Sequence, residues 1–191
     1  MNRLAARVAA RHEKRSYFIS SPTNANVVQR VLLHFLANMK GGSWLLWTAH
    51  WSVKGQSFIQ DHELFEQQYK TWVEHIDTLA EKTVSMFGSN CINPYSILAA
   101  SQEHIERFKD IDCLHKRSLA LEEDLQISIR TVYDILKGSQ GLSLGMDDFL
   151  MSMANTHEQF IYFLQQRIAD DAGRAGIEKP PYDFSLVGEP K

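Results

Sequence analysis

The sequence predicts an all-α fold, a bundle of four long helices, and three observations support this prediction. Apolar residues recur at three- and four-residue spacing through four long segments, with no alternating strand pattern between them. Only ten glycines and five prolines occur in 191 residues, and the prolines avoid the middle of these segments. Four amphipathic segments joined by short connections can bury their apolar stripes against one another, which is the arrangement of a four-helix bundle.

The helices are expected in the following order. The four long ones are predicted at Ala25 to about Trp51, Gln60 to Phe87, about Asp112 to Lys137, and Asp147 to about Ala172, with a short helix between Tyr95 and Ile111. The chain then divides into a basic arm at residues 1–20, a bundle at 21–172 and an irregular tail at 173–191. Gly41-Gly42, inside the first helix, either kinks it or marks the close approach of another backbone.

Composition narrows the class of protein. Hydrophobic residues make up 44% and charged residues 23% of the chain, the balance of a soluble globular protein. The longest apolar runs fall far short of a membrane span, so no membrane partner is expected. Two cysteines, Cys91 and Cys113, stand in no metal or redox spacing, which favours a reducing compartment and predicts a cytoplasmic protein.

Candidate metal ligands gather on the second predicted helix. His62 and Glu66 are four residues apart, as are Asp77 and Glu81, so each pair points the same way from consecutive turns. All four lie on a lateral face, away from the core stripe. His50, just before the intervening loop, can join His62. Imidazole together with carboxylate is a ligand set suited to iron and other divalent first-row metals.

Distance decides how these ligands can be used. His62 and Asp77 are fifteen residues apart, which is about 22 Å along a straight helix. Ligands of one metal ion form bonds of roughly 2.0–2.2 Å, so one chain cannot bring both pairs to one metal. A second copy of the helix, antiparallel across a two-fold axis, places His62 of one subunit opposite Asp77 and Glu81 of the other and creates two identical sites.

Each candidate ligand, taken singly, also has an explanation that involves no metal. Helices carry acids and histidines at four-residue spacing for solvation alone, and Asp77 with Glu81 is also a like-charge surface pair of no function. The combination of two imidazoles and three carboxylates on one lateral face is what favours a metal site.

At these residues the sequence resembles the DNA-protection-during-starvation (Dps) family of the ferritin-like superfamily. The similarity lies in Ala49-His50-Trp51-Ser52-Val53-Lys54-Gly55, then Phe58, His62-Glu63, Glu66 and His75-Ile76-Asp77-Thr78-Leu79-Ala80-Glu81-Lys82, and it extends over roughly residues 25–170, Thr156-His157-Glu158 included. The resemblance implies a ferritin-like bundle that assembles into a hollow homo-dodecamer of two-fold dimers. It further implies inter-subunit di-iron sites, a stored ferric oxide mineral and hydrogen peroxide as the usual oxidant.

The implied ligands map onto five positions of this sequence. His50, His62 and Glu66 would come from one subunit and Asp77 and Glu81 from its mate, with Glu81 bridging the two irons. His50, His62, Asp77 and Glu81 would be the catalytic residues of a ferroxidase.

The sequence also departs from the family in places. Glu66 stands where the family usually has Asp, Gln56 replaces a common proline and Lys82 a common arginine. A ferritin site within one bundle is a different arrangement, which needs Glu-x-x-His on two helices. No such motif occurs in the second or fourth predicted helix, and the first contains no Asp or Glu.

The basic arm leaves three interpretations open. Arg3, Arg7, Arg11, Lys14 and Arg15 against Glu13 give residues 1–15 a charge of +4, so the remaining chain carries −7. The arm at residues 3–15 could bind DNA phosphates, act as an organelle transit sequence, or dock on the surface as a solvated helix. The first two interpretations point to a nucleoid or an organelle. The function predicted is an iron-oxidising storage cage, and the alternative is a DNA-compacting structural cage with weak or no ferroxidase activity.

Overall fold

The computed structural model describes residues 22–175, and the side chains of residues 25–169 within them. Its elements are α2 (Pro22–Ser52), α3 (Phe58–Phe87), the short 3-10 helix η2 (Ser89–Cys91), α4 (Pro94–Glu106), α5 (Leu114–Gly138) and α6 (Leu144–Ala175). This range contains no strand. Four long helices with a short one between the second and third confirm the predicted fold class. The arm and all but the first residues of the tail lie outside the described residues.

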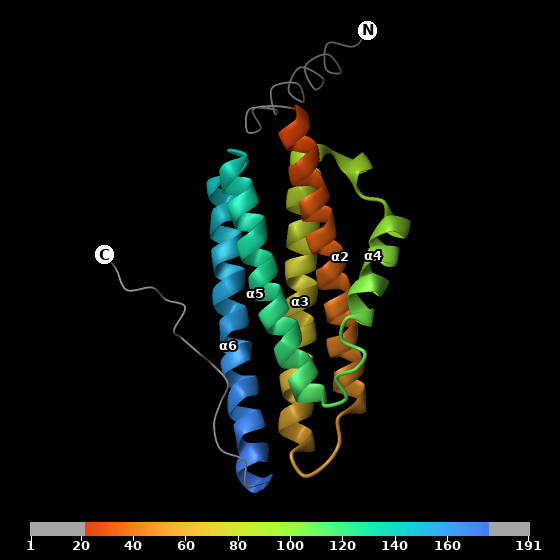
Figure 1. Ribbon diagram of the computed structural model, residues 1–191, viewed down its shortest axis with the longest axis vertical. Coiled ribbons are helices and arrows are strands. Elements are labelled where there is room, and N and C mark those ends of the chain that lie inside the picture. Colours follow the sequence, from red (N-terminus) through yellow and green to blue (C-terminus); the bar gives the residue numbers. More distant parts are fainter. Residues whose placement is uncertain (1–21, 176–191) are drawn as a thin grey trace, which may run out of the picture.

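The long helices pack side by side with their axes roughly aligned (Figure 1). α2 packs against α3, and α5 packs against α6. α4 lies along the outer side of α2, and the chain from α3 to α5 passes through it (Figure 1). No described helix is long and apolar enough to cross a membrane.

Helix boundaries differ from prediction by a few residues, and side-chain capping accounts for the starts of α4 and α6. α6 begins at Leu144 rather than Asp147, because the Ser143 hydroxyl accepts a hydrogen bond from the amide of Met146 at 3.2 Å. α4 begins at Pro94, where Asn93 Oδ1 accepts hydrogen bonds from the backbone amides of Tyr95 and Ser96 at 3.0 and 3.1 Å. A proline fits the first turn of a helix, where its missing N–H costs nothing.

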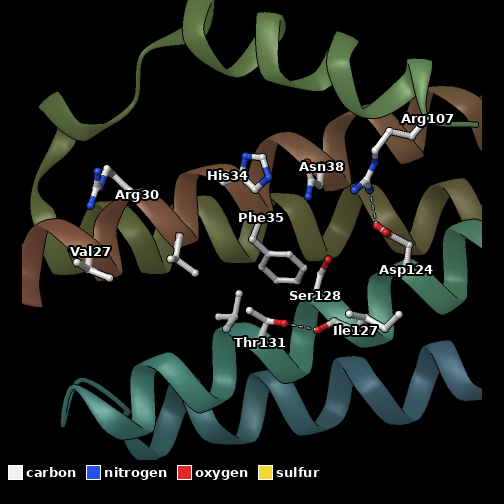
Figure 2. A pocket seen from close by; sticks show the side chains of 12 residues that line it. Val27, Arg30, His34, Phe35, Asn38, Arg107, Asp124, Ile127, Ser128 and Thr131 are labelled. Carbon is white, nitrogen blue, oxygen red and sulfur yellow. Dashed lines mark hydrogen bonds and ion pairs between the residues drawn. The ribbon is translucent and has the colours of Figure 1, made fainter.

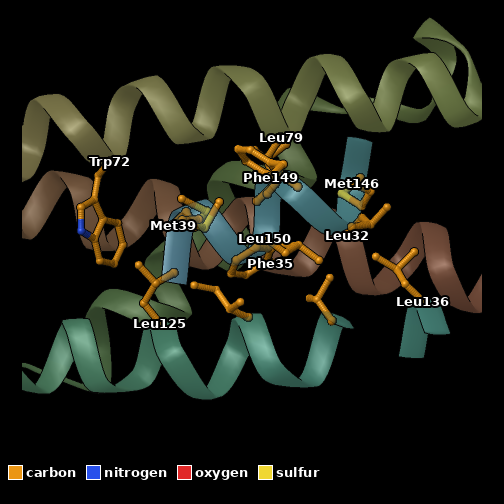
Figure 3. Packing of buried hydrophobic residues seen from close by; sticks show 14 of the residues in the cluster. Leu32, Phe35, Met39, Trp72, Leu79, Leu125, Leu136, Met146, Phe149 and Leu150 are labelled. Carbon is orange, nitrogen blue, oxygen red and sulfur yellow. The ribbon is translucent and has the colours of Figure 1, made fainter. Parts of the chain in front are cut away.

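The core runs along the bundle axis and is formed by the predicted apolar stripes (Figure 3). Leu32 and Met39 of α2 meet Trp72 and Leu79 of α3 there, all at 1% exposure or less. Figure 3 shows Leu125 of α5 and Leu150 of α6 reaching the same interior. Burying each such side chain contributes about 1.5–3 kcal/mol, which is the main stabilisation of these helices.

The two glycines of α2 mark close approaches. α2 passes through both without interruption. A Cβ on Gly41 would lie 2.6 Å from the carbonyl oxygen of Ser101 in α4. A Cβ on Gly42 would lie 2.7 Å from Cη2 and 3.2 Å from Cε3 of Trp72 in α3, and closer still to Cζ3. Of the two interpretations left open by the sequence, the structure therefore supports close packing on both sides of α2.

Candidate metal centre

Two of the predicted ligands meet where α2 ends and α3 begins. The imidazole rings of His50 and His62 stack with centroids 3.8 Å apart and planes inclined by 28°. His50 Nδ1 lies 3.1 Å from the carbonyl oxygen of His62, and His62 Nδ1 lies 3.0 Å from the carbonyl oxygen of His50. The two residues thus tie the end of one helix to the start of the next across the short connection.

These reciprocal bonds fix the tautomer of both rings. A carbonyl oxygen can only accept, so each Nδ1 must carry the proton that it donates. In the neutral ring Nε2 is then the bare nitrogen. Fixing the second ring nitrogen by a backbone carbonyl is the usual way in which proteins orient a metal-binding imidazole. When neutral, His50 and His62 are therefore both in the tautomer that can bind a metal through Nε2.

Glu66 stands one turn further along α3. Its carboxylate accepts a hydrogen bond from Lys70 Nζ at 2.6 Å. This hydrogen bond and the charge of Lys70 hold the pKa of Glu66 below its ordinary value, and the nearby imidazoles of His50 and His62 lower it further. The structure thus brings His50 and His62 into contact and places Glu66 one turn further along α3, with its carboxylate held by Lys70.

Asp77 and Glu81 do not join this group. Both lie on the same uninterrupted helix α3, both are exposed, and neither contacts a cation or hydrogen-bond donor among the described residues. Fifteen residues of straight helix separate His62 from Asp77 by about 22 Å. In the described part of the chain no three His, Cys, Asp or Glu side chains are placed to hold a metal ion. The candidate ligands of one chain therefore do not form a metal site by themselves.

An exposed aromatic surface adjoins the imidazoles. Trp44, Trp47 and Trp51 of α2 remain 40–57% exposed, with ring centroids 5.4–6.2 Å apart. Tyr69 of α3 stacks on Trp47 at 5.3 Å and meets His50 edge-on at the same distance. Three large exposed rings on one surface are unusual for a chain that remains single, because apolar surface of this size favours association.

A buried polar network in the bundle was missed by the sequence analysis. Glu122 of α5 is fully buried, and Gln68 and Trp72 of α3 donate to its Oε1 at 2.8 and 3.0 Å. His157 of α6 donates from Nδ1 to Oε2 at 2.7 Å, and its Nε2 lies 2.9 Å from His75 Nδ1. Burial and the neighbouring His157 lower the pKa of His75 to about 4.

One signal of this network was visible in the sequence. Glu122 stands beside Leu121 within the apolar stripe of the third predicted helix, and His157 lies between Met153 and Phe160 in that of the fourth. A polar residue on a core face must find a partner. Within the network both carboxylate oxygens of Glu122 and both ring nitrogens of His157 have hydrogen-bond partners.

The structure also has a groove of about 550 Å³ between α2 and α5. Figure 2 shows Arg30 and His34 along one side, Phe35 at its floor and an ion pair between Arg107 and Asp124 at one end. None of the candidate metal ligands lines this groove. It is separate from the candidate metal centre.

Comparisons with known proteins agree with this architecture. The family model described as a ferritin-like domain matches residues 36–172. A DNA protection during starvation protein from Brevibacillus brevis is 40% identical over 77 residues, which are 38% of this chain and 49% of that protein. The chain is thus matched to only about half the length of this relative.

Solved structures share the fold over most of the chain. Dps from Thermosynechococcus elongatus superposes with a TM-score of 0.65 at 19% identity, over 87% of this chain and 98% of that one. Dps from Vibrio cholerae O1, described as a member of a broad superfamily of ferritin-like diiron-carboxylate proteins, gives 0.64 at 18% identity, over 76% and 91%. The chain therefore belongs to the ferritin-like family, and its predicted resemblance to the Dps proteins is confirmed.

Proposed function

We propose that this protein oxidises ferrous iron at sites shared between two subunits and stores the ferric product inside a hollow cage of twelve subunits. The observation that carries the proposal is the pair His50 and His62, whose Nδ1–H groups donate to carbonyl oxygens, so that Nε2 of each neutral ring is free to bind a metal. They stand beside Glu66 and next to an exposed aromatic surface. This is half of a metal site at a surface suited to association.

A second copy of the chain supplies what is missing. In a two-fold dimer with antiparallel α3 helices, the Asp77 and Glu81 end of one helix lies opposite the His62 end of the other. The same contact covers Trp44, Trp47 and Trp51, which one chain leaves exposed. Each dimer then has two identical sites, each with two imidazoles and three carboxylates.

This donor set fits iron as a substrate. Imidazole nitrogen and carboxylate oxygen hold ferrous iron, and the carboxylates favour the higher charge of the ferric product. Two ferrous ions side by side each give one electron to hydrogen peroxide. The O–O bond of the peroxide breaks, and its two oxygens take up two protons to form two waters. Both electrons leave in one site, so no hydroxyl radical is released. The name of the Brevibacillus brevis relative, a protein of DNA protection, is consistent with such chemistry.

Subunit mixing tests where the site is built. His62→Ala and Asp77→Ala are each expected to abolish rapid peroxide-driven oxidation of ferrous iron. Co-expressed in equal amounts, the two variants form mixed dimers in which one of the two sites has both defects and the other is intact. Activity should therefore return to about a quarter of the wild-type level when pairing is random. A site within one chain would recover nothing, and single variants as active as wild type would refute the ferroxidase itself.

The particle size tests the cage. We expect a mass about twelve times that of the 21.9 kDa chain by light scattering. A mass of twenty-four chains would indicate a ferritin-type shell, and a monomer would exclude both.

A second function is favoured by the charge of the N-terminal arm. Residues 1–15 carry +4 on a chain of net −3, so the arm is the part suited to DNA phosphates, and a cage would present many arms at once. Deleting residues 2–15 should abolish a DNA mobility shift made by the full protein, and the wild-type shift should weaken steeply with salt. An unchanged shift after deletion would exclude the arm. A cytoplasmic, nucleoid-associated location accords with this function.

A further inference from the structure

The turn that carries His62 is also held from its other side. Asp61, the residue before it, is 3% exposed and faces α5 and α6. Arg167 of α6 donates to both of its carboxylate oxygens, from Nε to Oδ1 at 2.8 Å and from Nη2 to Oδ2 at 3.1 Å. His115 of α5 places Nε2 3.2 Å from Oδ1. Three helices therefore meet at one buried carboxylate.

The cost of burying this carboxylate is offset by its partners. Burial alone would raise the pKa of Asp61, but the hydrogen bond from Arg167 and the charges of His115 and Arg167 outweigh it and leave the pKa below the ordinary value. A planar guanidinium bound to both oxygens also fixes the direction of the carboxylate. The ring of His115 packs at 5.3 Å on Phe65, one turn along α3, which is fully buried.

The first turn of α3 has little else to hold it on this side. Ser57 stands at the N-cap position, but its side chain makes no capping hydrogen bond. Phe58, Ile59 and Gln60, the first three residues of the helix, are exposed. Apart from the hydrogen bond that the Phe58 amide donates to the Gly55 carbonyl oxygen at 3.2 Å, this helix end has no cap, and a helix end with no side-chain cap and no buried side chains would fray. Asp61 is the first buried residue of α3.

We propose that Asp61, held by Arg167 and His115, is a positioning residue that sets the direction of the His62 imidazole for metal binding. His50 holds the turn from the metal side through the two reciprocal bonds, and the Asp61 carboxylate holds it from the core side. Metal–nitrogen bonds tolerate only about 0.2 Å of misplacement, so a loosened turn weakens the bond at Nε2. The inference rests on the proposed function, because it assigns a partner to a ligand of that site.

Binding of Co²⁺ to the assembled full-length protein tests this role, since the absorption spectrum of Co²⁺ reports its ligands and geometry. Asp61→Asn keeps the size of the side chain and removes its charge. We expect Co²⁺ affinity to fall about 10- to 100-fold and the absorption band to change shape, the usual effect of losing a group that orients a ligand. Arg167→Gln should do the same, and Arg167→Lys, which keeps one charged donor, should recover part of the affinity.

Glu122→Gln is the matched control. It also neutralises a buried carboxylate paired with a histidine, but that carboxylate contacts none of the candidate ligands. It should lower thermal stability at least as much as Asp61→Asn and leave Co²⁺ affinity and spectrum unchanged. If Asp61→Asn binds Co²⁺ within twofold of wild type, or if Glu122→Gln loses as much affinity, the positioning role is refuted.

His62→Ala separates this inference from the proposed function. If His62→Ala loses Co²⁺ and Asp61→Asn does not, only the positioning role fails. If His62→Ala binds Co²⁺ as wild type does, the metal centre itself is wrong and the role of Asp61 falls with it.

Discussion

Replacing Gly42 by alanine tests the close packing of α2 against α3. The added methyl group would lie 2.7 Å from Cη2 of Trp72, whereas ordinary contact begins near 3.4 Å, so the ring or the helix must retreat by at least about 0.7 Å. The ring has little room to move. It is 1% exposed, and its Nε1–H donates to the buried Glu122 carboxylate at 3.0 Å. Retreat would therefore strain a hydrogen bond as well as a packed core.

The magnitude follows from two opposing effects. Overpacking a core costs about 1–3 kcal/mol, and the pinned indole places this site at the upper end. Alanine in a helix interior regains about 1 kcal/mol relative to glycine. The net expectation is a loss of about 1–2 kcal/mol, which lowers the melting temperature by roughly 2–8 °C for a chain of this size.

Thermal unfolding followed by circular dichroism measures this loss. Gly138→Ala is the matched control, because nothing lies within 4 Å of its added methyl group and α5 ends there. It should be neutral or stabilising by a few tenths of a kcal/mol to about 1 kcal/mol. In Gly42→Ala combined with Trp72→Phe, the smaller ring should relieve the clash, so the two losses should not add. A Gly42→Ala protein that melts at or above the wild-type temperature would refute the reasoning.

Three further predictions concern charged groups. Lys70→Met should raise Co²⁺ affinity up to about fivefold, because Lys70 forms an ion pair with the Glu66 carboxylate in the metal-free chain. Lys137→Met is the control. A Co²⁺ titration of Lys70→Met that matches wild type would mean that Lys70 does not compete with the metal for Glu66. Glu122→Gln should destabilise the bundle by about 3–5 kcal/mol in denaturant unfolding, since it breaks a fully buried pair with His157, and a loss below 1 kcal/mol would contradict this account. Burial and the charges of Arg107 and His34 lower the pKa of His104 to about 4. Between pH 6.5 and 4, His104 is therefore protonated in the unfolded chain and neutral in the folded chain. The melting temperature should therefore fall across this window as pH is lowered, and it should fall less steeply in His104→Gln. Parallel plots of melting temperature against pH for the two proteins would exclude His104 as a cause of this pH dependence.

The bundle could be predicted because its helices are set by periodic apolar stripes. Apolar residues at helical spacing in the second predicted helix include Trp72 and Leu79, and both are buried in the core. The ends were less accurate, since Ser143 caps α6 through a side chain whose role depends on local geometry. Whether Gly41 and Gly42 kink α2 or allow close packing could not be decided from sequence. The groups that they approach belong to α4 and α3, which are remote along the chain.

The candidate site could be predicted as a set of residues but not as an arrangement. Helical spacing put His62 and Asp77 on one side of one helix, and the uninterrupted α3 bears out that premise. The bonds that fix the His50 and His62 tautomers use backbone carbonyls, which every residue has and no pattern reveals. Asp61 escaped notice for a related reason, since its partner Arg167 is 106 residues away.

The separation of the two ligand pairs along α3 has a consequence for when the chemistry can occur. Under the proposed function a newly made or dissociated subunit cannot oxidise iron, because its own carboxylates never reach its own imidazoles. Activity would then depend on protein concentration, with a second-order dependence below the dissociation constant of the dimer and a linear one above it. Assembly would precede catalysis, so ferric product would form only where a shell is present to contain it.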